Sequence, residues 1–362
     1  MTLALILVVF TLGLAFTNGA NDVSKAIATL AGAGVSKYRT AITWGSLCTV
    51  AGALAAGFAS QALVATFSGK GLVAAPALSS AFLLAVASGT VAWLIIATRS
   101  GLPVSTTHAL AGSLIGTAVV ASGVSGVVWR AVAMKIALPL LASPVFALVI
   151  VLLVGPLLRP LALRFGNYCL CVEQTCAAAV TTEGMVFREA VPAIAVRDTE
   201  RCTSAVARIG ALDALHWASS GATSFFRGMN DAPKVLAIGL AAGKLVGISG
   251  AMLYALVAAA MGAGSMIAGL RVTRTLAEKV TPITPANGLA ANLVTSLLVA
   301  AASRFAVPVS TTHVSTGAIV GTGLSGGGSG VRWKTLGEIL LAWMVTLPAS
   351  ALCAGVVFFL ID

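Results

Sequence analysis

The 362-residue chain is too apolar for a water-soluble protein, since 58% of its residues are hydrophobic, 9% are charged and its mean hydropathy is +1.01. A soluble domain normally carries about a quarter of charged residues, so a soluble helical bundle is excluded. The net charge of +11 does not indicate a nucleic-acid partner, because the basic residues are scattered among short loops without interleaved aromatic residues. Lysines and arginines in short loops suit the cytoplasmic side of a membrane protein.

Long apolar stretches recur along the chain, each close to or beyond the roughly 20 residues that a helix needs to cross the hydrocarbon core. The longest are residues 41–67, 76–98, 131–158, 245–270 and 336–361. Together with weaker, glycine-interrupted segments they predict about ten to twelve membrane passes. The first segment, residues 1–16, has no basic start and runs directly into a polar motif. It is therefore interpreted as a membrane helix and not as a cleaved signal peptide.

The first polar motif, Gly-Ala-Asn-Asp-Val-Ser-Lys, occupies residues 19–25. Asp22 and Lys25 lie in an apolar region, where ionisable side chains are costly and by default functional. Glycine and asparagine before the aspartate predict a break in the helix, which is tolerated where it lines a cavity enclosed by protein. The alternative is an aspartate that only caps the helix starting at Val23. A second copy of the motif favours the functional charge pair.

The second motif, Pro-Val-Ser-Thr-Thr-His, occupies residues 103–108. Its proline suits the first turn of a helix, where no amide hydrogen is needed. Ser105, Thr106 and Thr107 can converge on one ligand only at a helix start or a hairpin tip. There they would join free amide groups and the positive end of the helix dipole, which together form an anion site. Hydroxyls that bond back to carbonyls or join two helices are the alternative.

His108 ends this motif, and His313 ends its later copy. A histidine beside a hydroxyl suggests a nucleophile with its base, so a membrane-embedded hydrolase using Ser/His is the alternative from another class. No orienting carboxylate is near in the sequence, and duplicated catalytic groups would be unusual. Two histidines and two aspartates without tight spacing are weak support for a metal site. We therefore expect no catalytic residue, no metal and no cofactor, and interpret both histidines as hydrogen-bonding residues of hairpins.

Residues 159–208 contain six basic and five acidic residues and four of the six cysteines, so they cannot lie in lipid. Their basic edges predict a small soluble insert on the cytoplasmic side. Alternating residues at 185–188 and 193–197 predict short strands. The cysteines at 169, 171, 176 and 202 could bind zinc, although their spacing fits no common pattern. The two others lie in apolar helices, where a free cysteine ordinarily packs.

The second half of the chain repeats the first. Residues 228–234, Gly-Met-Asn-Asp-Ala-Pro-Lys, correspond to the first motif, and residues 307–313, Val-Pro-Val-Ser-Thr-Thr-His, correspond to the second. The motifs are 81 residues apart in the first half (22 to 103) and 77 apart in the second (231 to 308). Two more landmarks return 204 positions later, with Trp129-Arg130 and Pro144 corresponding to Trp333-Lys334 and Pro348. Four landmarks in register indicate an internal duplication.

The chain therefore divides into a membrane repeat at 1–158, the insert at 159–208 and a second membrane repeat at 209–362. Both chain ends lack positive charge, which suits the outer face. With the insert inside and both termini outside, each repeat crosses the membrane an odd number of times and the repeats are inverted. One of the basic pairs at 130/135 and 332/334 would then lie outside. The predicted fold is an all-α polytopic membrane protein with two inverted repeats, broken helices and hairpins, the design of a secondary transporter.

The duplicated motifs resemble those of the inorganic phosphate transporter family (PiT), whose signature has the form Gly-Ala-Asn-Asp-Val-Ala-Asn followed by a Pro-Val-Ser-Thr-Thr-His type segment. The resemblance covers both halves and implies a multi-pass carrier in the cell membrane, often a homodimer, that moves phosphate with sodium or protons; some relatives carry sulfate. It assigns the oxyanion to Ser105, Thr106, Thr107, Ser310, Thr311 and Thr312. It assigns the coupling ion to Asn21, Asp22, Asn230 and Asp231.

The chain departs from the family pattern three residues after each aspartate, where Lys25 and Lys234 replace asparagine. An ammonium one helical turn from the carboxylate would supply the positive charge that sodium otherwise brings and would repel the ion. We therefore expect phosphate transport by alternating access without sodium, driven by protons through Asp22 or Asp231 or by the anion's own gradient. A sodium-coupled phosphate symporter is one alternative.

A sulfate permease is another alternative, because sulfate has only acceptors and a lysine-bound aspartate leaves mostly donors in the site. Phosphate keeps a proton and needs an acceptor, and the family resemblance favours it. A channel would line one continuous pore with rings of charge or carbonyls. Duplicated, enclosed charge pairs fit alternating access better.

Overall fold

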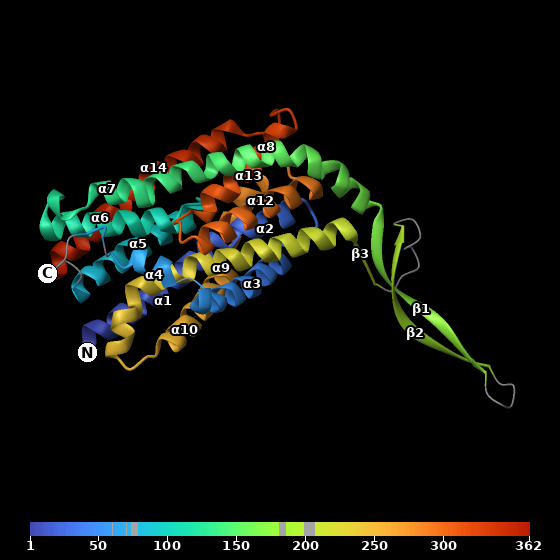
Figure 1. Ribbon diagram of the computed structural model, residues 1–362, viewed down its shortest axis with the longest axis horizontal. Coiled ribbons are helices and arrows are strands. Elements are labelled where there is room, and N and C mark those ends of the chain that lie inside the picture. The colour runs from blue at the N-terminus through green and yellow to red at the C-terminus, as the bar shows by residue number, and fades with distance from the viewer. Residues whose placement is uncertain (60, 70, 74–78, 181–185, 199–206) are drawn as a thin grey trace.

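The computed structural model describes residues 1–59, 61–69, 71–73, 79–180, 186–198 and 207–362. It shows an elongated bundle of helices with a small sheet that extends from one end (Figure 1). The first repeat contains α1 (Thr2–Asp22), α2 (Ser24–Gly32), α3 (Tyr38–Ala59), α4 (Gln61–Phe67), α5 (Ser80–Ser100), α6 (Thr106–Ser122), η1 (Val124–Gly126), α7 (Trp129–Val132), η2 (Ala133–Ala137) and α8 (Leu138–Gly166). The second contains α9 (Ala211–Leu245), α10 (Gly250–Ala268), α11 (Leu270–Glu278), α12 (Pro285–Arg304), α13 (Thr311–Ser325) and α14 (Trp333–Ile361).

Within the described residues, seven helices are long and apolar enough to cross a membrane, which confirms an all-α polytopic fold. They are Thr2–Gly32, Tyr38–Gly57, Ser80–Ser100, Trp129–Gly166, Gly250–Ala268, Pro285–Arg304 and Trp333–Ile361. The ten to twelve passes expected from the sequence also counted weaker segments. Of these, α6 and α13 have 17 and 15 residues, fewer than the roughly 20 that a full pass needs. The 35-residue α9 is long enough, but it carries charged side chains at its centre.

The two repeats pack crosswise against each other. Helix α3 of the first repeat packs on α9 of the second, and the corresponding pair, α10 of the second and α1 of the first, packs in the same way. Likewise, α6 of the first repeat packs on α14 of the second, and α13 of the second packs on α8 of the first. Figure 1 shows α1 and α9 running in opposite directions, as do α8 and α14. Both termini lie at the end of the bundle away from the sheet. The predicted inverted repeats are confirmed. The core forms between the repeats as well as within each one, where α1 packs on α5 and α9 packs on α12.

Glycines make these crossings close. A Cβ added to Gly264 of α10 would collide with the carbonyl oxygen of Phe16 in α1. At the symmetric crossing, a Cβ on Gly52 of α3 would collide with the carbonyl oxygen of Phe225 in α9. Helices approach this closely where small residues line the contact, as is common in membranes. The crossings bring the polar C-terminal end of α1 and the middle of α9 to the centre of the bundle.

We expect Gly264→Ala to destabilise the protein, because its methyl group would separate α1 from α10, and overpacking costs about 1–3 kcal/mol. Gly337→Ala in α14 is the matched control, since no atom of the described residues lies within 4 Å of its added Cβ. There the change should stabilise the helix by about 0.5–1 kcal/mol. Thermal unfolding of both variants in one detergent measures the difference, and equal shifts for the two would contradict the close crossing.

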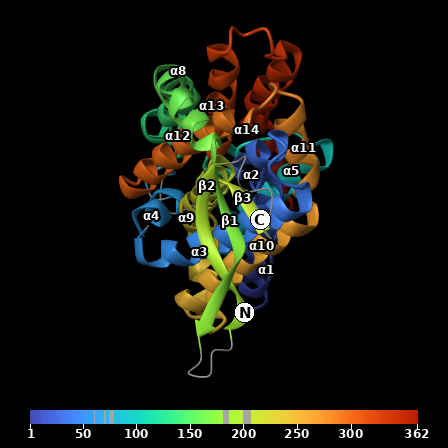
Figure 2. The ribbon, with the colours of Figure 1, turned by 90° about the vertical axis from the view of Figure 1, so that its right-hand side faces the viewer.

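The insert forms a three-stranded antiparallel sheet of β1 (Tyr168–Val180), β2 (Val186–Asp198) and β3 (Ala207–Gly210), in the order β2-β1-β3. Figure 2, viewed from the sheet side, shows it in front of the helical bundle. The predicted strands at 185–188 and 193–197 are confirmed as parts of the single strand β2, although Met185 lies outside the described residues. Helix α8 continues to Gly166 before the sheet begins.

The expected break in the helix at each Asn-Asp motif is much smaller than predicted. Only Val23 separates α1 from α2, and its backbone (φ −57°, ψ −31°) is still close to helical. In the second repeat the break is absent, because α9 runs through Gly228, Asn230 and Pro233. Helix α9 is packed against α3, α12 and α1, and Gly228 lies directly against the backbone of Thr49 in α3. This packing keeps the segment helical in spite of its low helix propensity. The charged groups thus come from regular helix, and not from unwound backbone.

Candidate functional site

The first ion pair lies at the junction of α1 and α2. The Lys25 ammonium lies 2.7 Å from Asp22 Oδ1 and donates to two oxygens of Asn21, the carbonyl at 2.7 Å and Oδ1 at 2.8 Å. These three acceptors use all three donors of the ammonium group. Both charged side chains are buried. Asp22 therefore pairs with Lys25 and does not cap a helix, and Val23 has no side-chain cap on α2.

The second ion pair lies in the middle of α9 and reaches the other repeat. The Lys234 ammonium lies 3.1 Å from Asp231 Oδ1 and donates to the carbonyl oxygen of Val309 at 3.0 Å. Its third acceptor is Thr107 Oγ1, at 2.9 Å, at the start of α6 in the first repeat. The side chain of Asn230 donates to Asp231 Oδ1 at 2.9 Å. Lys234 thus joins the charged motif of one repeat to the hydroxyl motif of the other.

The hydroxyl motifs form the starts of α6 and α13. Ser105 is the N-cap of α6 and accepts a hydrogen bond from the amide of His108, while Ser310 caps α13 through the amide of His313. The predicted helix starts are confirmed. The predicted position of Pro103 and Pro308 in the first turn is wrong, since both lie before the helices. Pro103 lies two residues before the cap of α6 and not in its first turn, because the serine hydroxyl takes the capping position.

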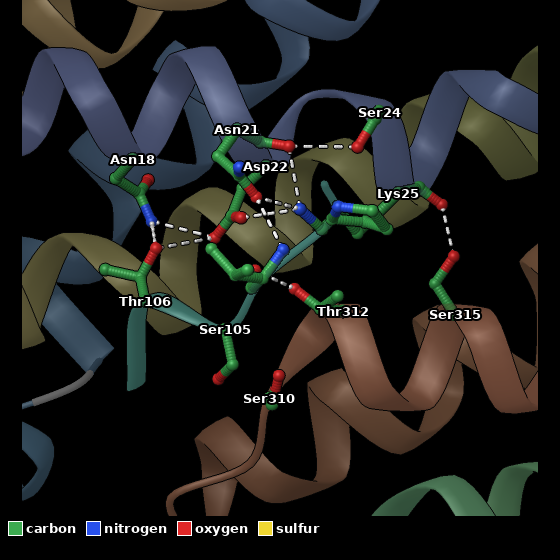
Figure 3. A network of polar contacts seen from close by, with 12 residues as sticks. Asn18, Asn21, Asp22, Ser24, Lys25, Ser105, Thr106, Ser310, Thr312 and Ser315 are labelled. Atoms are coloured by element: carbon green, nitrogen blue, oxygen red, sulfur yellow. Dashed lines mark hydrogen bonds and ion pairs between the residues drawn. The ribbon is translucent and has the colours of Figure 1, made fainter. Parts of the chain in front are cut away.

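The two helix starts also bond to each other across the repeats. Thr107 Oγ1 donates to the carbonyl of Val309 at 3.4 Å, and Thr312 Oγ1 donates to the carbonyl of Val104 at 2.8 Å. Figure 3 shows Thr312 of α13 reaching toward the segment that precedes α6. Thr311, the first residue of α13, is buried beside them. All six predicted hydroxyl residues therefore lie at one place, where the two repeats meet.

The asparagines hold these helix starts in position. Asn21 donates to the carbonyl of Leu102 at 3.0 Å and accepts from the amide of Val104 at 3.2 Å. In the second repeat, Asn230 donates to the carbonyl of Val309 at 3.5 Å. Each asparagine therefore connects the charged motif of its own repeat to the hydroxyl motif of that repeat. This places both asparagines among the positioning groups of the site.

Asn18 joins the charged groups of both repeats, and the sequence pattern did not single it out. Its amide nitrogen lies 2.9 Å from Asp22 Oδ2 and 3.1 Å from Thr106 Oγ1 (Figure 3). It also lies 3.3 Å from Asp231 Oδ2. Thr106 also donates to Asp22 Oδ2 at 3.1 Å. The two carboxylates thus face one amide group. Asn18 stands one helical turn before Asp22, and that spacing was the signal for it in the sequence.

Arg227 is the counterpart of Asn18 in the second repeat, four residues before Asp231, and it too was missed. Its side chain is completely buried, with Nη2 donating to Thr49 Oγ1 of α3 at 2.6 Å. Aligning the two repeats could have identified it, since the charged Arg227 stands where the first repeat has the amide side chain of Asn18. A third buried cation therefore belongs to the cluster.

The histidines do not form a catalytic arrangement. The His313 ring stacks on Trp343 with centroids 3.8 Å apart, lies 4.6 Å from the His108 ring and has Nδ1 3.0 Å from the carbonyl oxygen of Leu140. Ser105 Oγ is bonded to the backbone amide of His108 and not to its ring. Among the described residues no histidine ring bonds a serine hydroxyl, and no group of three or more His, Cys, Asp or Glu could hold a metal. Cys202 of the zinc alternative lies outside the described residues.

The assembled cluster is suited to an anion. Two helices begin at the same place, and the first amide groups of a helix have no partner within it. Their N–H groups and the positive ends of two helix dipoles therefore lie close together, which favours a negative ligand. In the described conformation the hydroxyls of Thr107 and Thr312 donate to carbonyl oxygens of the other repeat, as in the helix-joining alternative. The side chains of both motifs are almost completely buried, so the described conformation is closed to both faces of the bundle.

Comparison with known proteins identifies the family. A model described as the phosphate transporter family matches residues 18–354. A protein of Mycobacterium tuberculosis (strain ATCC 25618 / H37Rv), named "Probable low-affinity inorganic phosphate transporter", is 31% identical over 99% of this chain and 78% of its own. A protein of the same name from Rhizobium meliloti is 29% identical over 96% of this chain and 93% of its own. The solved structure named "The sodium-dependent phosphate transporter" has the same fold, with a TM-score of 0.76 at 21% identity over 99% of both chains. The chain therefore belongs to the phosphate transporter family.

Proposed function

We propose that this protein is a secondary transporter that moves inorganic phosphate across the cell membrane by alternating access. The observation that carries the proposal is the meeting of α6 and α13, one from each repeat, with their hydroxyl motifs bonded across the repeats through Thr107 and Thr312. An anion held there would contact both repeats, so a tilt of one repeat against the other would open the site to alternate sides. The names of the relatives support phosphate as the substrate.

We further propose that transport does not require sodium. Each lysine ammonium already donates to three oxygen acceptors, one of which is a carboxylate. The acceptors of Lys25 are two oxygens of Asn21 and one of Asp22, and those of Lys234 belong to Thr107, Asp231 and Val309. A sodium ion bound to the same oxygens would have to displace a cation of the same charge. Protons are the proposed coupling ions, taken up by Asp22 or Asp231. The structural neighbour is named sodium-dependent, and the alternative of sodium coupling follows from that name.

Phosphate is favoured over sulfate by two buried acceptors. Asn18 Oδ1 and Asn230 Oδ1 have no hydrogen-bond partner among the described residues. Their amide nitrogens face carboxylates, which only accept, so the oxygens must point elsewhere. A protonated phosphate can donate to such oxygens, whereas sulfate cannot. The cluster thus offers acceptors in addition to its donors, although both aspartates are paired with lysines.

Uptake of radiolabelled phosphate into proteoliposomes tests these proposals. We expect uptake in choline medium to equal uptake in sodium medium, and to rise when a proton gradient is imposed, because lysines replace the cation. Unlabelled phosphate and arsenate should compete with labelled phosphate, and sulfate should compete at least tenfold more weakly, since a missing hydrogen bond at a buried acceptor costs about 1–3 kcal/mol. Strict dependence on sodium would contradict the coupling proposal, and equal competition by sulfate would contradict the substrate proposal.

The same experiment separates a carrier from a channel or an enzyme. A carrier gives saturable uptake without single-channel currents, whereas a channel gives currents. We propose that the protein is not an enzyme, which is supported by its match to a family of transporters. The insert is proposed to face the cytoplasm with both termini outside, supported by the position of the termini away from the sheet in Figure 1. Cysteine-accessibility labelling of intact cells at residue 2 and in β2 would test this orientation.

A further inference from the structure

Five charged side chains are buried among the described residues, and all belong to the cluster at the centre of the bundle. Asp22 with Lys25 and Asp231 with Lys234 form two ion pairs, so their charges cancel. The fifth is Arg227, which is 0% exposed. The buried cluster therefore has one positive charge in excess. A transporter whose empty site carries this charge in the bilayer interior favours a ligand of opposite sign.

Arg227 has donors without a partner in the part of the chain that the structure describes. Nη2 donates to Thr49 Oγ1, but Nε and Nη1 have no hydrogen-bond partner among these residues. The guanidinium interacts electrostatically with Asp22 and Asp231, yet it forms no ion pair with either of these two carboxylates. A buried charged group with unused donors is strongly unfavourable unless a partner supplies acceptors. The unused donors indicate a ligand that is not part of the chain.

The position of Arg227 in the repeat connects it to the hydroxyl motifs. Its counterpart Asn18 contacts Thr106 at the start of α6 as well as the carboxylates of Asp22 and Asp231. Arg227 stands at the same distance before Asp231, on the face of α9 that bears the second ion pair. It replaces the neutral amide of the first repeat with a guanidinium, whose planar fork fits two oxygens of a phosphate group.

We propose that Arg227 binds the transported anion directly through Nε and Nη1, and that the anion enters with one net negative charge. The inference rests on the proposed transport of an oxyanion and adds its binding residue and its charge state. For phosphate, the ligand is dihydrogen phosphate, or monohydrogen phosphate together with one proton. Either would leave the loaded cluster neutral. Sulfate alone would leave one negative charge in excess.

Equilibrium binding of labelled inorganic phosphate to the full chain in nanodiscs tests the residue. Arg227→Gln should weaken binding about 10- to 100-fold, the loss expected for hydrogen bonds to a charged group. Arg227→Lys keeps the positive charge but lacks the planar guanidinium group. Its affinity for phosphate should lie between those of the unmodified protein and Arg227→Gln. Arg304→Gln, the same change at an exposed position at the end of α12, should bind as the unmodified protein does.

The pH dependence of binding to the unmodified protein tests the charge. One negative charge requires one more proton than the dianion carries, so above the second pKa of phosphate the affinity for total phosphate should fall about tenfold per pH unit. The other ionisable groups around the site are the members of the two ion pairs, together with His108 and His313. A proton taken up by Asp22 or Asp231 together with monohydrogen phosphate would give the same pH dependence as dihydrogen phosphate, because either way one proton binds with each dianion. An affinity that stays constant over this range would overturn the assigned charge.

The outcomes separate this inference from the proposed function. Phosphate binding by Arg227→Gln within twofold of the unmodified protein would overturn the role of Arg227 while leaving phosphate transport intact. If the unmodified protein binds labelled sulfate and not phosphate, the proposed substrate is wrong, and the same variants measured with sulfate still test Arg227. If Arg227→Gln fails to fold in a thermal unfolding measurement, weaker binding by a folded Arg227→Lys supports the role of the guanidinium, and unchanged binding overturns it.

Discussion

Replacing both lysines of the ion pairs, as Lys25→Asn with Lys234→Asn, makes phosphate uptake sensitive to sodium. The double variant loses two buried cations. The carboxylates of Asp22 and Asp231 then have no cation beside them, and the oxygens of Asn21 and Val309 lose the ammonium donors that they bonded. Uptake in choline medium should fall about tenfold or more, because each lost charge-assisted hydrogen bond is worth about 1.5–3 kcal/mol. Sodium should restore part of it, because a sodium ion can bind the freed oxygens.

The measurement is uptake into proteoliposomes over a series of sodium concentrations with choline as the balancing cation. Lys244→Asn with Lys279→Asn is the matched control, since it removes the same two charges from exposed positions of the chain. We expect this control to transport like the unmodified protein in both media. If the buried double variant showed no response to sodium, the lysines would serve only as counter-ions of the aspartates.

Removing one partner of an ion pair should cost more stability than removing both. Asp22→Asn leaves Lys25 buried with no carboxylate beside it, and breaking a buried ion pair costs about 3–5 kcal/mol. It also removes a charged acceptor of Asn18 and Thr106. We expect this variant to lose transport and to unfold more readily. Adding Lys25→Gln removes the unpaired charge and should recover about half or more of the lost stability, because replacing a complete buried pair is often nearly neutral.

Thermal unfolding in detergent of the two single variants and the double variant forms a double-mutant cycle that isolates the interaction. Glu338→Gln, which removes an acidic charge from the exposed side of α14, is the control and should leave the unfolding transition where it is. A double variant as unstable as the sum of the two single variants would contradict a direct ion pair. The double variant is not expected to transport, since the site would still lack its carboxylate.

Much of the architecture could be predicted, because membrane helices are long apolar stretches and the second half of this chain repeats the motifs of the first. Apolar stretches of sufficient length predict helices, and the register between Asp22 and Asp231 predicts two equivalent halves. The location of Ser105 and Ser310 at helix starts also follows from sequence, since proline and hydroxyl residues are typical of that position. These features depend on residues close together in the chain, and local patterns are sufficient for them.

The remainder of the site depends on contacts between the repeats, which no local pattern contains. The bond from Lys234 to Thr107 joins residues 127 positions apart, and Asn18 contacts Asp231 across 213 positions. The unbroken course of α9 through Pro233 was also unpredictable, because tertiary packing against α3, α12 and α1 overrides the low helix propensity of glycine and proline. Arg227 lies one residue before the second Asn-Asp motif, which begins at Gly228, so the motif itself does not include it.

The crosswise packing of the repeats has a consequence for how such a protein can be assembled. Helix α1 buries its glycine-lined face on α10, and α3 buries its own on α9, so neither half completes its core alone. A polypeptide that contained only one half would need a second copy inserted upside down in the same bilayer before these faces could be covered. Insertion in both orientations, in equal numbers, would then be a condition of folding. Joining the halves through the insert fixes that ratio within a single chain.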